Sequence, residues 1–340
     1  MQILKDTEFA CGFGAEWSYG KSYSIDSSRK KGFVTDYQKI PFPIYLIPYG
    51  TTDEYSEDEI YWAFEEGYHE KFTDRFGQYV ERLYQHELCI NHKIITNSPD
   101  CLEFVQYNNY GLAKDDPLYD TRLVKRIKTD KKGTISVYYD NANDIRNAAY
   151  AFSPQFGRDT WPHLLLHQNL KESVDISLFE SIYVSFNMHI LSCKQMSLWP
   201  DDGTVTKPYS LPVSAVNAFF YIKEKGGGSS MFAGHNIFAT NKTVQNRFIG
   251  LDQYGTVFYR ETTEEYGGIP QIGDRVTVRY ELRSLIKRAL AEASARDPRF
   301  RNKTPDDYTI EFFQTGWENM GVWRGEFVLS GLSCEGKPKT

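Results

Sequence analysis

Short runs of β-forming residues, separated by turn residues, dominate the chain after about residue 89. Within several of these runs hydrophobic and polar side chains alternate, which is the period of a strand buried on one face. About ten such runs at this spacing are typical of an antiparallel sandwich or jelly roll. The expected strands cover residues 102–107, 134–139, 161–166, 182–191, 213–222, 246–251, 257–259, 275–280, 309–315 and 323–329.

One helical pattern interrupts the strands near the C-terminus. Its apolar residues recur at helical spacing on one face, and Asp297-Pro298 marks its end. The sequence therefore predicts one helix in this half of the chain, near residues 282–295. The apolar face consists of Leu282, Leu285, Ile286, Ala289, Leu290 and Ala293.

The first part of the chain has a different pattern. Residues 1–55 are rich in Gly, Ser, Tyr and Pro and predict extended, loop-heavy structure. Ser56 and Glu59 then form a capping-box pattern, and apolar residues follow at helical spacing as far as residue 83. This apolar stripe could form a groove for a partner, but we expect it to face the core. The sequence thus predicts an N-terminal extension with a helix (1–88) packed on a β-jelly-roll domain (89–335).

Composition sets limits on function. With 41% hydrophobic and 25% charged residues, the 340-residue chain can bury a substantial core. Its 39 Lys and Arg against 45 Asp and Glu give a net charge of −6, which argues against a basic face spread over the whole molecule. We therefore expect no nucleic-acid partner. Aromatic residues make up 15% of the chain, which favours an aromatic-rich sheet.

The sequence also addresses location and cofactors. The first residues carry acids where a secretory leader has a basic start, and the longest apolar stretch, 211–222, is too short to span a bilayer. The expectation is a soluble protein without a membrane partner, cytoplasmic by default and secreted if a leader has been removed. The five cysteines are scattered, with no C-x-x-C spacing, so no disulfide framework, metal or other cofactor is expected.

Two predicted strands carry polar side chains on one face. Alternation places Trp161, His163 and His167 together on the first strand, and Asn187 and His189 together on the second. If the strands pair, this face could act as acid and base, line a sugar cleft or, least favoured for lack of acids, hold a metal. These residues could equally be ordinary hydrogen-bonded groups on a half-solvated sheet.

The most specific signal lies near the C-terminus. After the predicted helix come a strand, the sequence Gly316-Trp317-Glu318, which we expect to form a turn, and a second alternating strand. This order resembles the jelly-roll (concanavalin-like) endoglucanases that cleave cellulose, xyloglucan or mixed-linkage glucan. In that family a Gly-x-Glu after a short helix supplies the acid/base carboxylate. The resemblance covers about the last half of the chain and depends on order and spacing more than on identity.

The resemblance implies a fold and a function. The fold would be an all-β, concanavalin-like jelly-roll sandwich with one helix in its C-terminal half and a partly helical N-terminal extension. The function would be endo-action on a polysaccharide or oligosaccharide, with Glu318 as general acid/base and Trp317 and Trp323 stacking on sugar. Asn217 and Gln314 would lie in the cleft with the histidine-bearing face.

The sequence departs from the family at one important position. The family's nucleophile is a glutamate in the strand equivalent to 213–222, where this chain has Asn217 as the nearest polar residue. Retaining hydrolysis needs two carboxyl groups about 5–5.5 Å apart. Another acid would have to serve, and the candidates are Asp159, Glu180, Glu224 and Glu326.

Two alternatives remain open at this stage. A polysaccharide lyase would need a base, a group that neutralises a uronate and an acid, and the His, Asn and Tyr residues supply all three. A glycan-binding module would need only the aromatic residues and no second carboxylate. The basic segment 122–132 could contact an acidic sugar or nucleic acid, but its alternation favours a hairpin with one solvated face.

Overall fold

The computed structural model describes most of the chain from residue 163 onward and parts of the chain before it. The described residues are 1–4, 7–9, 12–17, 21–26, 44–49, 90–98, 100–108, 115–119, 121–140, 163–196, 213–240, 247–251, 256–262, 270–320 and 323–340. The helix predicted between residues 56 and 83 lies outside these ranges.

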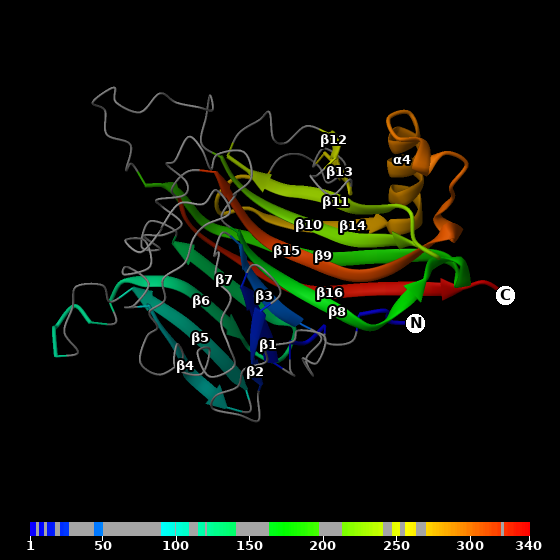
Figure 1. Cartoon of the computed structure of the whole chain (residues 1–340). Helices are drawn as coiled ribbons and strands as arrows, with labels where there is room; N and C mark the ends of the chain where they lie inside the picture. The colour runs from blue at the N-terminus through cyan, green and yellow to red at the C-terminus, as the bar shows by residue number, and fades with distance from the viewer. Residues whose placement is uncertain are drawn as a thin grey trace, which may run out of the picture.

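Two β-sheets make up the described part of the molecule (Figure 1). Most neighbouring strands are antiparallel, but β1 (Gly12–Trp17) runs parallel to β3 (Ile44–Tyr49), and β11 (Ser230–Ala239) runs parallel to β13 (Val257–Glu261). One sheet has nine strands in the order β12 (Phe248–Leu251), β13 (Val257–Glu261), β11 (Ser230–Ala239), β10 (Val213–Glu224), β15 (Tyr308–Met320), β8 (His163–Asp175), β3 (Ile44–Tyr49), β1 (Gly12–Trp17) and β2 (Lys21–Asp26). The other has seven in the order β14 (Arg275–Glu281), β9 (Phe179–Gln195), β16 (Trp323–Pro338), β7 (Thr134–Asp140), β6 (Leu123–Thr129), β5 (Cys101–Asn108) and β4 (Ile90–Ser98).

The core lies between the two sheets and follows from strand alternation. Along β9 every second residue through the middle of the strand is a buried hydrophobic, and the intervening residues face outward. The ring of Phe186 in β9 lies 6.3 Å from the ring of Phe313 in β15, so the inner faces of the two sheets are in contact. This architecture confirms the predicted all-β sandwich.

One α-helix, α4 (Leu282–Ser294), confirms the helix predicted from the apolar spacing. All six predicted apolar residues are buried, and the helix packs beside β9, β11 and β14 (Figure 1). Its N-terminus is capped by Glu281, whose carboxylate accepts hydrogen bonds from the backbone N–H groups of Arg283 and Ser284. Such a cap satisfies helix N–H groups that otherwise lack partners.

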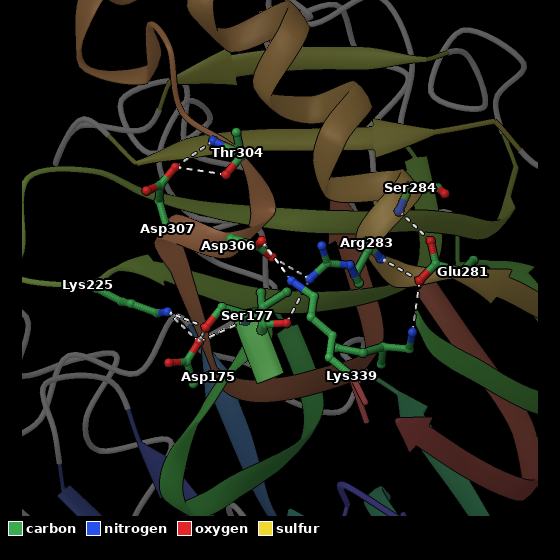
Figure 2. A network of polar contacts seen from close by, with 12 residues as sticks. Asp175, Ser177, Lys225, Glu281, Arg283, Ser284, Thr304, Asp306, Asp307 and Lys339 are labelled. Carbon is green, nitrogen blue, oxygen red and sulfur yellow. Dashed lines mark hydrogen bonds and ion pairs between the residues drawn. The ribbon is translucent and has the colours of Figure 1, made fainter. Parts of the chain in front are cut away.

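A network of ion pairs joins segments that are distant in sequence (Figure 2). The Arg283 guanidinium on α4 contacts Asp306 at 2.8 Å, and Lys339 near the C-terminus contacts the same carboxylate at 2.9 Å. The short 3-10 helices η2 (Ile176–Leu178) and η5 (Pro305–Asp307) are thereby tied to the helix and to the C-terminus. The hydrogen bond from Lys339, followed by that from Arg283, lowers the pKa of Asp306.

Described strands from before residue 88 join the same sheet as strands from after it. Strand β3 pairs with β8, so β1, β2 and β3 belong to the nine-stranded sheet itself. At the N-terminus Ile3 and Leu4 are buried in the same core, and the Ile3 N–H donates to the carbonyl of Cys334 at 2.7 Å. The sequence of residues 1–55, which is rich in Gly, Ser and Pro, indicated loops because it lacks the long alternation of the later strands.

The basic segment forms strand β6 and a hairpin with β7, as predicted. Its face is less solvated than expected, because Lys125 is 2% exposed and lies 5.7 Å from the centre of the Tyr139 ring. Arg126 forms an ion pair with Glu326 of β16 at 2.9 Å. Lys125 and Arg126 therefore make contacts within the seven-stranded sheet.

Candidate functional site

Strand β15 separates core from candidate site by simple alternation. Phe313 and Trp317 point between the sheets, and the Trp317 indole N–H donates to the carbonyl of Val137 in β7 at 3.4 Å. Gln314 and Glu318 therefore belong to the opposite, outer face of the nine-stranded sheet. The expected Gly-Trp-Glu turn is wrong, because β15 continues without interruption through these residues.

Two asparagines accompany Glu318 on this outer face. Asn217 lies on the neighbouring strand β10, paired with Gly316, and hydrogen bonding from its side chain acts to lower the pKa of the Glu318 carboxyl group. The Nδ2 of Asn236 on β11 donates to the Oδ1 of Asn217 at 2.7 Å. Asn217 and Asn236 are 2% and 0% exposed, so this chain of amides is shielded from water. The arrangement places a carboxyl group at the end of a buried polar chain.

The pKa of Glu318 reflects this environment. Burial raises it from an ordinary value of 4.5 to about 7, against the opposing effects of the Arg260 charge and of the hydrogen bond from Asn217. Arg260 comes from β13 in the same sheet, and burial lowers its own pKa. A carboxyl group with a pKa near neutrality exchanges a proton readily at physiological pH, which is the property of a general acid/base.

A row of aromatic rings crosses four strands of the same outer face. Phe258, Phe232, Tyr221 and Phe312 are register neighbours on β13, β11, β10 and β15. Their ring centres are 4.6–4.9 Å apart, and the pairs Phe232–Phe258 and Tyr221–Phe312 are stacked at 18° and 15°. Rings stacked on one another stabilise the sheet and cover each other's faces, so the row offers less ring surface to a sugar than a flat platform does.

Neither tryptophan predicted to stack on sugar is available for that role. Trp317 is 1% exposed, and its ring lies 5.7 Å from that of Phe327 in β16. Trp323, the first residue of β16, is 6% exposed and belongs to the seven-stranded sheet. The resemblance suggested both tryptophans as sugar-stacking residues, and their burial follows from strand alternation, because a continuous strand buries every second side chain.

The predicted polar face is divided between the two sheets. His163 and His167 lie on β8, where they are the register partners of Glu318 and Gln314. Asn187 and His189 lie on β9 of the other sheet, where the Asn187 side chain accepts a hydrogen bond from Thr277 at 2.9 Å. The two strands do not pair because the chain crosses between sheets at η2. Trp161 lies outside the described residues.

The structure also tests the acids considered as partners for Glu318. Glu180 is on β9 and Glu326 on β16, both in the seven-stranded sheet. Glu224 is at the far end of β10, where it forms an ion pair with Lys303. None of these three carboxylates lies beside Glu318, and the fourth candidate, Asp159, lies outside the described residues.

The sequence predicted Glu318, Asn217 and Gln314 as candidate site residues, but it did not predict Asn236 or Arg260. Asn236 lies on β11, a strand that was not predicted from the sequence. The available signal was the polar Asn236 at an alternating position after Phe232. Arg260 follows directly after a predicted strand that ended two residues too early.

The described residues contain no group of three His, Cys, Asp or Glu side chains that could hold a metal ion. No helix within the described ranges is both long and apolar enough to cross a membrane.

Comparisons with known proteins give similarities in structure only. An endoglucanase of glycoside hydrolase family 12 from a metagenome aligns with a TM-score of 0.37 at 10% identity, covering 70% of this chain and 91% of its own. An endoglucanase from Rhodothermus marinus aligns with a TM-score of 0.36 at 10% identity (70% and 92%). A family 11 xylanase from Neocallimastix patriciarum aligns with a TM-score of 0.33 at 7% identity (70% and 92%). No family model and no curated protein matches the sequence.

Proposed function

We propose that this chain is a carbohydrate-active protein in which Glu318 serves as general acid/base toward a glycan on the outer face of the nine-stranded sheet. The observation that carries the proposal is the Glu318 carboxyl group, which is partly buried, is hydrogen-bonded by Asn217 and has its pKa raised to about 7 by burial. The C-terminal sequence pattern gives independent support, because it resembles that of jelly-roll endoglucanases at this glutamate.

The chemistry follows from the protonation state of Glu318. At neutral pH a large fraction of the carboxyl group is protonated and can donate a proton to a glycosidic oxygen as the bond to the sugar breaks. The resulting carboxylate can then remove a proton from water. Hydrolysis needs a second carboxylate to attack the sugar or to activate that water. Asn217 occupies the neighbouring strand, and its amide cannot perform either role.

A second candidate is glycan binding without cleavage. Position 217, on the strand next to Glu318, carries an amide and not a carboxylate, and this favours glycan binding without cleavage. A neutral carboxyl group would still donate and accept hydrogen bonds with sugar hydroxyls. The lyase alternative loses support, because Asn187 and His189 lie in the sheet that does not contain Glu318.

A product assay on neutral and acidic polysaccharides tests the proposal. New reducing ends without an unsaturated uronate signal would establish hydrolysis, and Glu318→Gln should then reduce the rate at least about 10²-fold. Glu311→Gln is a matched control on the same strand, since Glu311 hydrogen-bonds to Ser173 and Thr309 away from Glu318. Glycan retardation in a gel without products would favour the binding module. Neither turnover nor binding on the whole panel, or a rate unaffected by Glu318→Gln, would contradict the proposal.

A further inference from the structure

The amide of Asn217 has two chemically different ends, and their orientation decides what Glu318 encounters. An Nδ2 facing the carboxyl group donates a hydrogen bond and stabilises the carboxylate. An Oδ1 facing it accepts a hydrogen bond from the protonated acid and stabilises the neutral form. Asn217 alone could turn either end toward Glu318, because the two ends have nearly the same shape.

Asn236 removes this ambiguity. Its Nδ2 donates to the Oδ1 of Asn217 at 2.7 Å, which commits the oxygen of Asn217 to β11 and leaves its Nδ2 for Glu318. The bond is fully buried, so water does not compete with it. We infer that Asn236 is a positioning residue, which acts through Asn217 to keep an N–H donor directed at Glu318.

The hydrogen-bond inventory of Asn236 supports this orientation. Its Oδ1 is buried and has no hydrogen-bond partner among the described residues. If both side-chain amides were flipped, the atom of Asn236 without a hydrogen-bond partner would instead be its Nδ2, which carries two N–H donors. Buried orphan donors are rarer in proteins than under-satisfied carbonyl oxygens, so the observed orientation is the less costly one.

The charge of Arg260 also acts on the titration of Glu318 without changing the role of Asn236. Arg260 on β13 is the charged residue that acts on Glu318 among the described side chains. On β8 the register partner of Glu318 is His163, and on β10 it is the uncharged Ala215. An uncharged substitution at Asn236 leaves Arg260 and His163 in place, so it tests the amide orientation alone.

The inference takes its catalytic meaning from the proposed function, but its test needs no substrate. The titration of the Glu318 carboxyl group is followed by carbon-13 NMR, with Glu318→Gln used to assign the signal. Asn236→Leu frees Asn217 to turn its oxygen toward Glu318, and the midpoint should rise by about one pH unit or more. Asn236→Ala removes the same donor without adding bulk and provides a second variant should the first fail to fold.

A double-mutant cycle shows whether Asn236 acts through Asn217. Asn217→Ala should raise the midpoint by itself, and adding Asn236→Leu to it should produce no further rise. Ser214→Ala is the matched control, because Ser214 forms a buried 2.6 Å hydrogen bond with Asn319 between the same strands, β10 and β15. It should leave the midpoint unchanged.

The outcomes separate the two proposals. An unchanged midpoint in folded Asn236→Leu or Asn236→Ala, or additive shifts in the cycle, would overturn the positioning role whatever the protein does to glycans. The expected shifts in a protein without turnover or glycan binding would leave the positioning role intact and remove the proposed function.

Discussion

Trp317 and Glu318 are adjacent in sequence and lie on opposite faces of the nine-stranded sheet. The indole of Trp317 fills the core and hydrogen-bonds to Val137 of the other sheet, whereas the carboxyl group of Glu318 joins Asn217 on the outer face. The core packing of Trp317 therefore fixes the position of the strand that presents Glu318. The dipeptide Trp317-Glu318 therefore contributes one residue to the core and the other to the candidate site.

Asn217→Glu should create or strengthen hydrolytic activity. The C-terminal resemblance implies that this strand carries the nucleophile in jelly-roll endoglucanases, and Asn217 already contacts the Glu318 carboxyl group. A glutamate here would supply the second carboxylate that retaining hydrolysis needs. We expect the release of reducing ends to rise at least about 10²-fold on an accepted glucan, with retained anomeric configuration in the product NMR spectrum.

The control for that substitution is Asn217→Gln, which adds the same length without the charge and should give no gain. A folded Asn217→Glu variant that binds glycan as the unsubstituted protein does, yet shows no gain in rate, would rule out Asn217 as the position of a missing nucleophile.

Glu318 should make the protein less stable as pH rises. Its folded pKa of about 7 exceeds the ordinary value of 4.5, so the folded state binds the proton more tightly than the unfolded state between these pH values. The free energy of unfolding therefore falls as pH rises from about 4.5 to 7, by up to about 3 kcal/mol. Urea denaturation at several pH values should show a smaller fall in Glu318→Gln. Parallel pH profiles for the two proteins would contradict the elevated pKa.

The sequence predicted the elements whose patterns are long and regular. Helix α4 was predicted because its six apolar residues repeat at one spacing, and the run 182–191 because hydrophobic residues alternate along it. Strands β1 and β2 were missed because their short sequences are rich in Gly and Ser; the two pair with each other, and only the partner β3 of β1 is distant in sequence. Strand propensity is judged from residues close together along the chain, whereas the formation of β1 and β2 depends on pairing within the sheet.

The candidate site was predictable in part for the same reason. Glu318 and Asn217 were identified from their place in a strand order, and the structure brings them together. Asn187 and His189 were grouped with the wrong face, because local alternation indicates which residues of one strand share a side but not which sheet that strand joins. The crossing at η2 is a property of tertiary structure.

Arg283 should contribute to stability through the network at the end of the sandwich. Its guanidinium donates to the carbonyl of Ile176 at 2.7 Å and contacts Asp306, so Arg283→Ala leaves a carbonyl without its partner. We expect a loss of about 1–3 kcal/mol in the free energy of unfolding. Lys339→Ala, which removes a half-exposed ion pair with the same carboxylate, should cost less than about 1 kcal/mol. Equal losses in chemical denaturation would contradict this ranking.

The same network should weaken in acid. The pKa of Asp306 is lowered in the folded protein, so its contribution is present above the unfolded pKa and is lost as pH falls through the folded value. Asp306→Asn should therefore cost stability at neutral pH and little at strongly acidic pH. A loss that stays constant across this range would show that the charge of Asp306 is not the stabilising feature.

Gly325 should be coupled to Trp317 across the core. A Cβ at Gly325 in β16 would lie 2.6 Å from Cζ2 and 2.8 Å from Cη2 of the Trp317 indole, closer than such atoms approach each other. Gly325→Ala should therefore destabilise the protein by about 1–3 kcal/mol. In the background of Trp317→Phe, which lacks the larger ring system, the same substitution should cost less, and thermal or urea denaturation of the four proteins measures the difference. Additive losses would mean that the two positions do not share this contact, and with it the core placement of Trp317 would fail.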